Sequence, residues 1–336
     1  NQILVTSNTL SSSKILDKYK LKKTIHQFFP IDTNFLTKKF LDYWSPTSVF
    51  FIDSEIWPNM IFNLKSRGIK VALINGRITN KTFKRWEKVK NFSKQIFLKF
   101  DLCLSSSIET KSYLKKLGVK SPKFIGNLKF SQSENEMIGI EKNLKRFINS
   151  KTTWCASSTH KTEELFCGLV HKTLKEKYKN LLTIIIPRHI NRTSSIIEEL
   201  KDLNLKVHMH EPQKKIINDT DIYIVNSYGK TKSFYKNCKN IFLGGSLIKH
   251  GGQNPLEAAR YGCKILHGPH VGNFKEIFQY LKKRKISLGV NSKSKMISSL
   301  ENLFAKKTRS FEIRKKINLI GKKILDNTYK EIINLI

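Results

Sequence analysis

Short apolar runs alternate along the chain with longer segments in which apolar residues recur at helical spacing. The short runs have the length of buried strands and the longer segments suit crossover helices, so the pattern predicts parallel sheets. A first series of strands is expected at residues 3–6, 49–52, 70–74, 102–104 and 123–125. A second series is expected at residues 153–156, 182–186, 206–209, 222–225, 241–243 and 264–266.

A polar stretch without a strand pattern separates the two series, and we place a linker there, at residues 136–150. The prediction is therefore a first Rossmann-like domain at residues 1–135 and a second at residues 151–310. Residues 311–336 are expected to form amphipathic helices that pack back toward the first domain. In doubly wound α/β domains, ligands bind beyond the carboxyl ends of the strands.

The composition fits a chain with two hydrophobic cores. Of the 336 residues, 39% are hydrophobic, and no apolar run approaches the ~20 residues that a membrane-spanning helix needs. The five cysteines include no Cys-x-x-Cys pair, which argues against a zinc site or a disulfide framework and favours a reducing compartment. The nine histidines show no metal-type spacing, so neither a metal nor another cofactor is expected.

The formal net charge is +36, which is extreme for this length. One interpretation is an anionic partner, either a nucleic acid or a phosphate-rich membrane surface. The other is an AT-rich genome that inflates lysine, asparagine and isoleucine together. The lysines are scattered, and no aromatic-interleaved basic patch or nucleic-acid motif stands out.

The stretch LGGSLIKHGGQNPLEAARYG, residues 243–262, combines two glycine pairs with a helix start. Gly244 and Gly245 allow the backbone to approach a ligand closely, and Pro255 suits a first helical turn. Amides at a helix N-terminus favour phosphate, whereas Glu257 is suited to accept hydrogen bonds from ribose hydroxyls. Together they predict a nucleotide site; the alternative is a glycine-rich loop with a capping glutamate.

Polar residues follow other predicted strands of the second series. Arg188 comes directly after a strongly apolar strand and offers a planar fork for phosphate or carboxylate; the alternative is a solvated arginine on a surface loop. The hydroxyl residues 157–159 precede a helical segment, and we expect helix capping there rather than an anion site. Asp219 and Asp221 resemble a metal-binding Asp-x-Asp motif, but they precede a strand, which is the wrong end for a site.

Two motifs of the first series also follow predicted strands. Asp53 and Glu55 lie between an apolar strand and a helix that Pro58 could start, where carboxylates are placed for hydrogen bonding or proton transfer; a role in fixing the turn is the alternative. Lys129, in Gly126-Asn127-Leu128-Lys129-Phe130, is expected to face an interdomain cleft.

The order of these motifs along the chain is more specific than any one of them. It resembles the 3-deoxy-D-manno-octulosonic acid (Kdo) transferase family of lipopolysaccharide synthesis, from about Ile3 into the C-terminal helices. The motifs that carry the resemblance are Ser54-Glu55-Ile56-Trp57-Pro58-Asn59, Ile74-Asn75-Gly76-Arg77-Ile78, Gly126-Asn127-Leu128-Lys129-Phe130, Ser158-Thr159-His160, Pro187-Arg188-His189, residues 243–262, and Gly268-Pro269-His270 with Asn273-Phe274.

The resemblance implies a GT-B glycosyltransferase, in which two Rossmann-like domains face each other across a cleft. It implies metal-independent, inverting transfer of Kdo from CMP-Kdo to the lipid A precursor (lipid IVA), at the cytoplasmic face of the bacterial inner membrane. By position, Glu55 and Lys129 would stabilise charge at the reacting centre. The residues that would hold the donor are Pro187, Arg188, Tyr228, Gly229, Lys230, Gly245, Ser246, Asn254, Pro255, Leu256 and Glu257.

The chain departs from the family pattern at three points. Lys230 follows Gly229 where the family usually has a glutamate, and Ser131 stands where an aspartate is often found. Family members also carry a further segment ahead of the point that matches Asn1, with a membrane anchor and a glutamate that is the expected general base. An inverting transfer needs such a base, so the expectation is a truncated chain that binds the donor but transfers poorly.

The partners expected from this resemblance are CMP-Kdo, the lipid A precursor and an anionic membrane surface, but no nucleic acid. Two alternatives stay open: another GT-B transferase that uses a UDP-sugar on a lipid acceptor, and a non-catalytic basic protein that binds nucleic acid or membrane.

Overall fold

The computed structural model describes the chain except residues 1, 20, 133–138, 212–215 and 307. It divides into two compact units. Unit 1 comprises Asn1–Leu128 with Ile324–Ile336, and unit 2 comprises Lys129–Lys323. Each unit is described by itself below. The predicted domain boundary and the start of the predicted linker, residues 133–138, lie outside the described residues.

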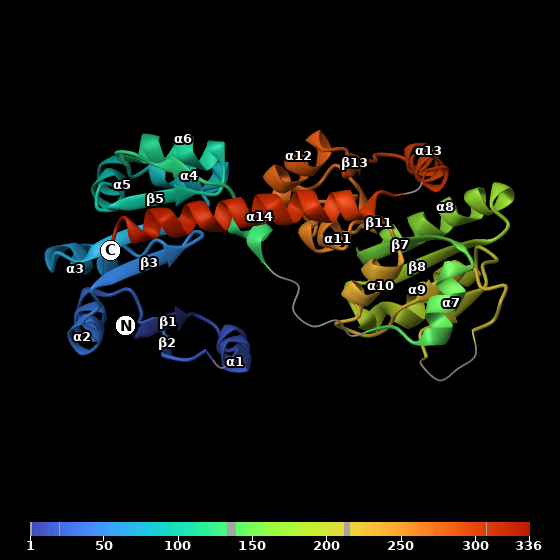
Figure 1. Ribbon diagram of the computed structural model, residues 1–336, viewed down its shortest axis with the longest axis horizontal. Helices are drawn as coiled ribbons and strands as arrows, with labels where there is room; N and C mark the ends of the chain where they lie inside the picture. The colour runs from blue at the N-terminus through green and yellow to red at the C-terminus, as the bar shows by residue number, and fades with distance from the viewer. Residues whose placement is uncertain (1, 20, 133–138, 212–215, 307) are drawn as a thin grey trace. The chain divides into compact units, whose positions relative to one another are not determined.

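Unit 1 contains a four-stranded parallel sheet in the order β3-β4-β5-β6 and a separate parallel pair, β1-β2 (Figure 1). The strands are β1 (Ile3–Ser7), β2 (Thr24–Phe28), β3 (Ser48–Ile52), β4 (Lys70–Gly76), β5 (Leu102–Ser105) and β6 (Lys123–Phe124). The helices are α1 (Leu10–Tyr19), α2 (Asn34–Trp44), α3 (Pro58–Ser66), α4 (Asn80–Glu87), α5 (Lys90–Phe97) and α6 (Ile108–Leu117). The pattern analysis missed β2, a strand whose five residues are all at least partly exposed.

Apolar side chains cover both faces of the four-stranded sheet. One face packs on helices such as α3 and α5, through Ile61 and Ile96. On the other face, Ile332 and Leu335 pack against Ala72, Ile74 and Leu104. The end of the long helix α14 (Ser310–Ile333) therefore belongs to the core of unit 1. An ion pair of 2.6 Å between Lys123 and Glu331 holds the same contact.

Unit 2 is built on a seven-stranded, fully parallel sheet in the order β13-β12-β11-β7-β8-β10-β9. The strands are β7 (Thr152–Thr159), β8 (Leu181–Pro187), β9 (Val207–Met209), β10 (Ile222–Ile224), β11 (Asn240–Leu243), β12 (Lys264–His267) and β13 (Ser287–Gly289). The helices, besides the first part of α14, are α7 (Lys142–Asn149), α8 (Glu163–Lys177), α9 (Thr193–Lys201), α10 (Thr231–Asn237), α11 (Leu256–Arg260), α12 (Lys275–Lys283) and α13 (Lys293–Phe304).

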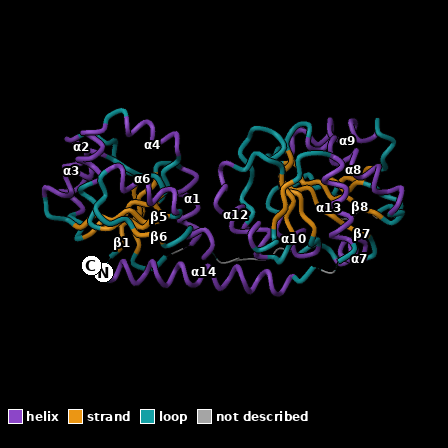
Figure 2. The backbone as a smooth tube through the Cα atoms, turned by 90° about the horizontal axis from the view of Figure 1, so that it is seen from above, coloured by secondary structure: helices purple, strands orange, loops and turns teal. Residues whose placement is uncertain are grey.

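The core of unit 2 explains why its strands were the easiest to predict. All seven residues of β8 are buried, as expected for a strand covered on both faces. One face of the sheet packs against α8, α9 and α13, through residues such as Val170, Ile196 and Met296. In Figure 2 the strands of the unit lie enclosed by helices. The final segment, predicted as amphipathic helices, contains the single helix α14 (Ser310–Ile333).

Candidate functional site

The strand order of unit 2 creates a switch point at β7. The chain moves from β7 to β8 on one side, and later returns to β11 on the other side. In open parallel sheets this is where ligands bind, beyond the carboxyl ends of the strands. Three loops meet there: the Arg188 amide donates to the Thr159 carbonyl at 2.9 Å, and the Gly244 amide donates to the Ser157 carbonyl at 2.9 Å.

Glu163, the first residue of α8, organises these loops from inside. Its side chain is 1% exposed, and its carboxylate accepts hydrogen bonds from the amides of Gly245 (2.6 Å), Ser246 (3.1 Å) and Leu247 (3.0 Å). It also accepts from the His160 amide at 3.0 Å. Charge-assisted bonds of this kind are among the strongest in proteins. The sequence analysis did not single out Glu163, because its role depends on a loop 82 residues away.

These bonds show what the glycine-rich loop already contacts. Gly245 and Ser246 were expected to hold the donor, and in the structure the amides of both residues donate to Glu163. The Ser246 hydroxyl donates to the Leu243 carbonyl and accepts from the Gly268 amide at 2.8 Å. Both residues therefore shape the loop from within.

The glycines also allow this loop to pack closely against its neighbours, because they carry no Cβ atom. A Cβ at Gly244 would lie 2.4 Å from the Ser158 carbonyl oxygen, so the close approach is to β7. Gly251 has φ +100°, and a Cβ there would lie 2.5 Å from the Asn273 side chain. Close approach to a ligand was predicted; the close neighbours that the structure shows for these glycines are the protein's own backbone and side chains.

Helix capping by the hydroxyl residues 157–159 was also wrongly predicted. Ser157 and Thr159 belong to β7, and the Ser157 hydroxyl is 2.8 Å from the Tyr235 hydroxyl. The N-cap of α8 is Thr162, which has φ +80° and makes no side-chain cap bond. The second glutamate of α8, Glu164, is fully buried and paired with both terminal nitrogens of Arg192.

Three histidines gather at the strand ends, which the spacing of histidines in the sequence did not reveal. The ring centroid of His160 lies 4.3 Å from that of His250 and 5.6 Å from that of His189. Burial, and then the charges of His250 and His189, lower the pKa of His160 to about 4, so its ring is neutral near pH 7. Arg188 is exposed beside this cluster. The sequence does contain a hint of this cluster, because a histidine follows each of the strands β8, β7 and β11, which are neighbours in the sheet.

The Asn-Pro-Leu-Glu segment forms a short, tightly held turn. The Asn254 side-chain oxygen accepts a hydrogen bond from the Leu256 amide at 3.1 Å, and Pro255 and Leu256 are buried. Helix α11 has only five residues, too few for the strong helix-end field that the sequence suggested. Glu257 is half-buried, and its charge contributes to raising the pKa of Tyr235 after the larger effect of burial.

The remaining predicted donor residues follow β10, two strands from β7 in the sheet order. Tyr228 is 68% exposed, and Gly229 has φ +79° with open space around its Cα. Lys230 is the N-cap residue of α10. They share the carboxyl edge of the sheet with Arg188.

Lys129 belongs to unit 2, where its backbone is fixed by Arg260. The Arg260 guanidinium donates to the Lys129 carbonyl, which ties the helical turn η1 (Leu128–Ser131) to α11. The Lys129 ammonium lies 5.8 Å from the ring centroid of Phe274. Glu55, the other residue expected at the reacting centre, belongs to unit 1.

In unit 1, polar side chains also cluster at the carboxyl ends of adjacent strands. Asp53 and Asn75 follow β3 and end β4, and both have left-handed backbones, with φ of 58° and 55°. The Asn75 amide donates to the Asp53 carboxylate, and its side-chain oxygen accepts from the Leu128 amide at 2.9 Å. Such strained non-glycine residues persist where the surroundings fix them, often at functional sites.

Glu55 is exposed, but its carboxylate is held in place. It accepts hydrogen bonds from the Trp57 indole at 2.7 Å and from the Asn8 side chain at 3.3 Å. Asp32, which the sequence analysis did not single out, caps the adjacent helix α3 by accepting from the amides of Asn59 (3.1 Å) and Met60 (2.8 Å).

The Asp-x-Asp motif has a structural role at the opposite edge of the unit 2 sheet. Asp221 is buried, pairs with Lys175 and lies 3.4 Å from the His171 ring nitrogen. Although burial opposes it, hydrogen bonding to His171 and Lys175 holds the pKa of Asp221 well below its usual value. Asp219 pairs with Lys206. Within the described ranges, no group of three or more histidine, cysteine or acidic residues is arranged to hold a metal.

Comparisons with known proteins place this arrangement in a family. The profile described as 3-Deoxy-D-manno-octulosonic-acid transferase (kdotransferase) matches residues 1–132. A 3-deoxy-D-manno-octulosonic acid transferase of Rickettsia felis is 33% identical over 90% of this chain and 65% of its own length. One from Rickettsia bellii is 31% identical over 90% of this chain and 72% of its own length.

The chain belongs to the Kdo transferase family. It spans about two thirds of the length of the relatives that it matches.

Solved structures agree at the level of the fold. UDP-GlcNAc 2-epimerase from Neisseria meningitidis superimposes with a TM-score of 0.61 at 12% identity, covering 99% of this chain and 90% of that one. A UDP-N-acetylglucosamine 2-epimerase homologue from Listeria monocytogenes gives 0.58, with coverage of 96% and 94%. The predicted GT-B class, with parallel sheets and covering helices, is confirmed.

Proposed function

We propose that this Kdo transferase family member transfers Kdo from CMP-Kdo to the lipid A precursor, with inversion and without a metal. The observation that carries the proposal is the family's motif set lying at the carboxyl edges of two parallel sheets. In unit 2, Arg188 and Glu257 are the residues that we assign to the donor. Arg188 supplies a fork for phosphate, and Glu257 is an acceptor for ribose hydroxyls.

The contacts of unit 2 refine this assignment. Because the amides of Gly245 and Ser246 are engaged by Glu163, the phosphate must find its positive charge in side chains. Arg188 is exposed next to the histidine cluster, so it can turn toward a bound anion. We assign Gly245, Ser246, Asn254, Pro255 and Leu256 to holding the loop in shape, and Tyr228, Gly229 and Lys230 to the outer rim of the donor site.

In unit 1 we assign Glu55 to the acceptor side of the reaction. Its carboxylate keeps unused acceptor capacity beyond the two hydrogen bonds from Trp57 and Asn8, because each carboxylate oxygen has two lone pairs. Lys129 in unit 2 is assigned to charge stabilisation. We place the general base in the segment that family members carry ahead of the point matching Asn1.

We further propose that the protein works at the cytoplasmic face of the inner membrane. No helix among the described residues is long and apolar enough to cross a bilayer. The net charge of +36 would draw the protein to anionic lipid surfaces, with binding that weakens as salt rises. Sedimentation with anionic vesicles at increasing salt tests this, and equal binding to neutral vesicles would count against it.

Donor binding is tested by thermal protection. CMP should raise the melting temperature more than UMP or UDP does, and Arg188→Gln should weaken CMP binding by about tenfold, the loss expected for one charged hydrogen bond. Lys172→Gln, which removes an exposed charge on α8, is the matched control and should bind CMP like the wild type. Preferential protection by UDP would favour a UDP-sugar transferase instead.

Transfer is tested by mass. The protein is mixed with freshly made CMP-Kdo and tetraacylated lipid A precursor, and the lipid is weighed for added Kdo. A gain that Glu55→Gln abolishes would support both the reaction and the assignment of Glu55. If the chain shows no gain, the assay is repeated with the family's upstream segment fused to it; a gain only then supports the upstream base, and none in either form rejects Kdo transfer.

A further inference from the structure

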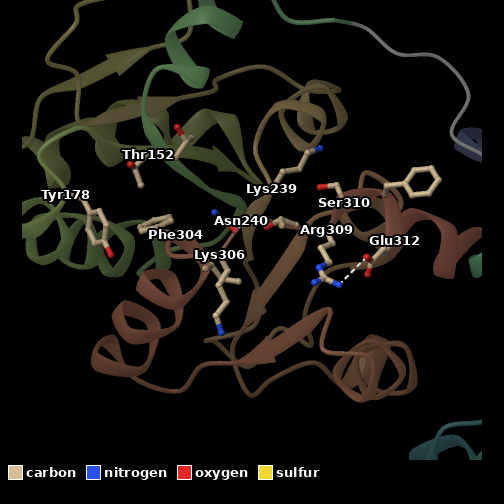
Figure 3. Close-up of a pocket in the computed structure, with 13 residues that line it drawn as sticks. Thr152, Tyr178, Lys239, Asn240, Phe304, Lys306, Arg309, Ser310 and Glu312 are labelled. Atoms are coloured by element: carbon tan, nitrogen blue, oxygen red, sulfur yellow. Dashed lines mark hydrogen bonds and ion pairs between the residues drawn. The ribbon is translucent and has the colours of Figure 1, made fainter.

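A cavity of unit 2 lies at the edge of the sheet opposite to the donor loops. It has a volume of about 980 Å³, within the usual range for small-molecule sites. Its lining includes Thr152 at the start of β7 and Asn240 at the start of β11, together with the first turn of α14 (Figure 3). A second cavity of about 510 Å³ shares five lining residues with the first: Leu303, Lys306, Thr308, Arg309 and Glu312.

The lining of the two cavities is strongly basic. The cations are Lys239, Lys264, Arg284, Lys306, Arg309 and Lys316, and the one acid among the lining residues is Glu312. The ratio is six to one in this lining and 62 to 26 in the whole chain, so what matters is how the individual cations are paired.

Two of the six cations are already matched. Arg309 is 3.4 Å from the Glu312 carboxylate, as the dashed line in Figure 3 marks. The Lys239 ammonium donates to the carbonyls of Tyr235, Lys236 and Tyr261 at 2.8–3.0 Å, which uses all three of its protons. No carboxylate of the described part of the chain pairs with the other four cations.

The remaining four cations, Lys264, Arg284, Lys306 and Lys316, all line the smaller cavity. Lys264 donates to the carbonyl of Lys285, so its ammonium is fixed at the start of β12. Burial lowers the pKa of Lys264, and the charges of Lys316 and Lys285 lower it further. Arg284 lies over the Tyr280 ring, with its guanidinium carbon 3.6 Å from the ring centroid, which fixes its plane. Like charges gathered in this way repel one another unless an anion binds between them.

Other features of the lining suit an anion with an organic part. Ser310, the first residue of α14, lines the larger cavity, and its amide donates to the Thr308 carbonyl at 2.9 Å. Tyr178 and Phe304 pack edge to face at 5.2 Å and form an apolar wall of the larger cavity.

We propose that these two cavities, which share part of their lining, together bind a small molecule that carries one or more phosphate groups. The phosphate lies among Lys264, Arg284, Lys306 and Lys316, and its organic part lies against Tyr178 and Phe304. Four unmatched cations, one of them a planar fork, suit a multiply charged phosphate better than a single carboxylate. The site is separate from the donor loops and does not rest on the proposed transferase reaction.

The test uses the whole chain and inorganic tripolyphosphate, with calorimetry at low salt. The variant Lys264→Gln with Lys316→Gln should weaken binding at least tenfold. The control Lys172→Gln with Lys201→Gln removes the same charge from exposed positions on α8 and α9 and should change binding less than twofold. Lys306→Gln is a second variant for the same binding measurement. Because Lys306 is exposed, its replacement is not expected to disturb folding.

Hydrogen exchange locates the bound anion. Tripolyphosphate should protect amides of residues 310–316 at the start of α14, and Arg188→Gln should leave that protection unchanged. The proposal is overturned if the wild type does not bind, if both double variants weaken binding equally, or if Arg188→Gln abolishes it. Equal weakening would indicate general attraction to a basic protein, and the last result would place the anion at the donor loops.

Discussion

At the carboxyl edge of the unit 2 sheet, four backbone amides point at one buried carboxylate, that of Glu163. At the amino edge of the same sheet, four cations line a cavity without a carboxylate partner among the described residues. The first edge carries its own internal anion, so its loops are rigid before any ligand arrives. The second edge still lacks an anion, so a ligand can supply one. Cations without a carboxylate partner therefore indicate a ligand site better than a high local charge does by itself.

The largest expected effect comes from removing the internal anion. Glu163→Gln should lower the free energy of unfolding by about 3–5 kcal/mol, because buried amides lose a charged acceptor and the glutamine NH₂ group faces other donors. Urea unfolding measures the change. Glu176→Gln, at an exposed position on the same helix, is the control and should change the free energy by less than about 0.5 kcal/mol. Similar values for the two variants would break the comparison between the edges.

A smaller effect is expected from crowding the same loop. Gly244→Ala places a Cβ 2.4 Å from a backbone oxygen of β7, so the loop must move, and such overpacking costs about 1–3 kcal/mol. Gly272→Ala is the matched control, because a Cβ there has no heavy atom within 4 Å. We expect thermal unfolding to separate the two variants. If Gly244→Ala melts with the wild type, the loop is looser than the hydrogen bonds to Glu163 imply.

A pH dependence is also expected at the carboxyl edge. The pKa of His160 is about 4 in the folded chain, below the ordinary value of 6.5, so the unfolded chain binds more protons between these values. The stability should therefore fall as the pH drops from about 6.5 to about 4. Other charges that face His160 are His250, His189, Arg188 and Arg192.

The measurement is the urea midpoint of the wild type and of His160→Gln across this pH range. The variant should lose less stability on acidification, because its side chain cannot take up a proton. Parallel curves for the two proteins would show that His160 does not contribute to the acid sensitivity, and would leave the other buried histidines of unit 2 as its source.

The sequence predicted the strands of unit 2 well because their burial on both faces leaves continuous apolar runs, as in residues 182–186. It missed β2, whose residues are all at least partly exposed, and β13, in which only Ser287 is buried. Arg188, Glu257, Glu55 and Lys129 were proposed as site residues because each follows a predicted strand or lies in an ordered family motif. The histidine cluster was missed because its members are far apart in sequence and meet only where neighbouring strands end.

The sequence by itself determined the fold class, the family and the edge of each sheet where polar residues collect. These follow from the periodicity of apolar residues and from motif order, which are local properties of the chain. Only the tertiary structure decided which groups are already partnered. Glu163 meets the amides of the glycine-rich loop, and Lys239 meets three carbonyls, through contacts that no local pattern encodes. Hydrogen bonds between distant segments therefore separate two cases. The glycine-rich loop is already held by Glu163, whereas the basic cavity keeps cations that can bind a ligand.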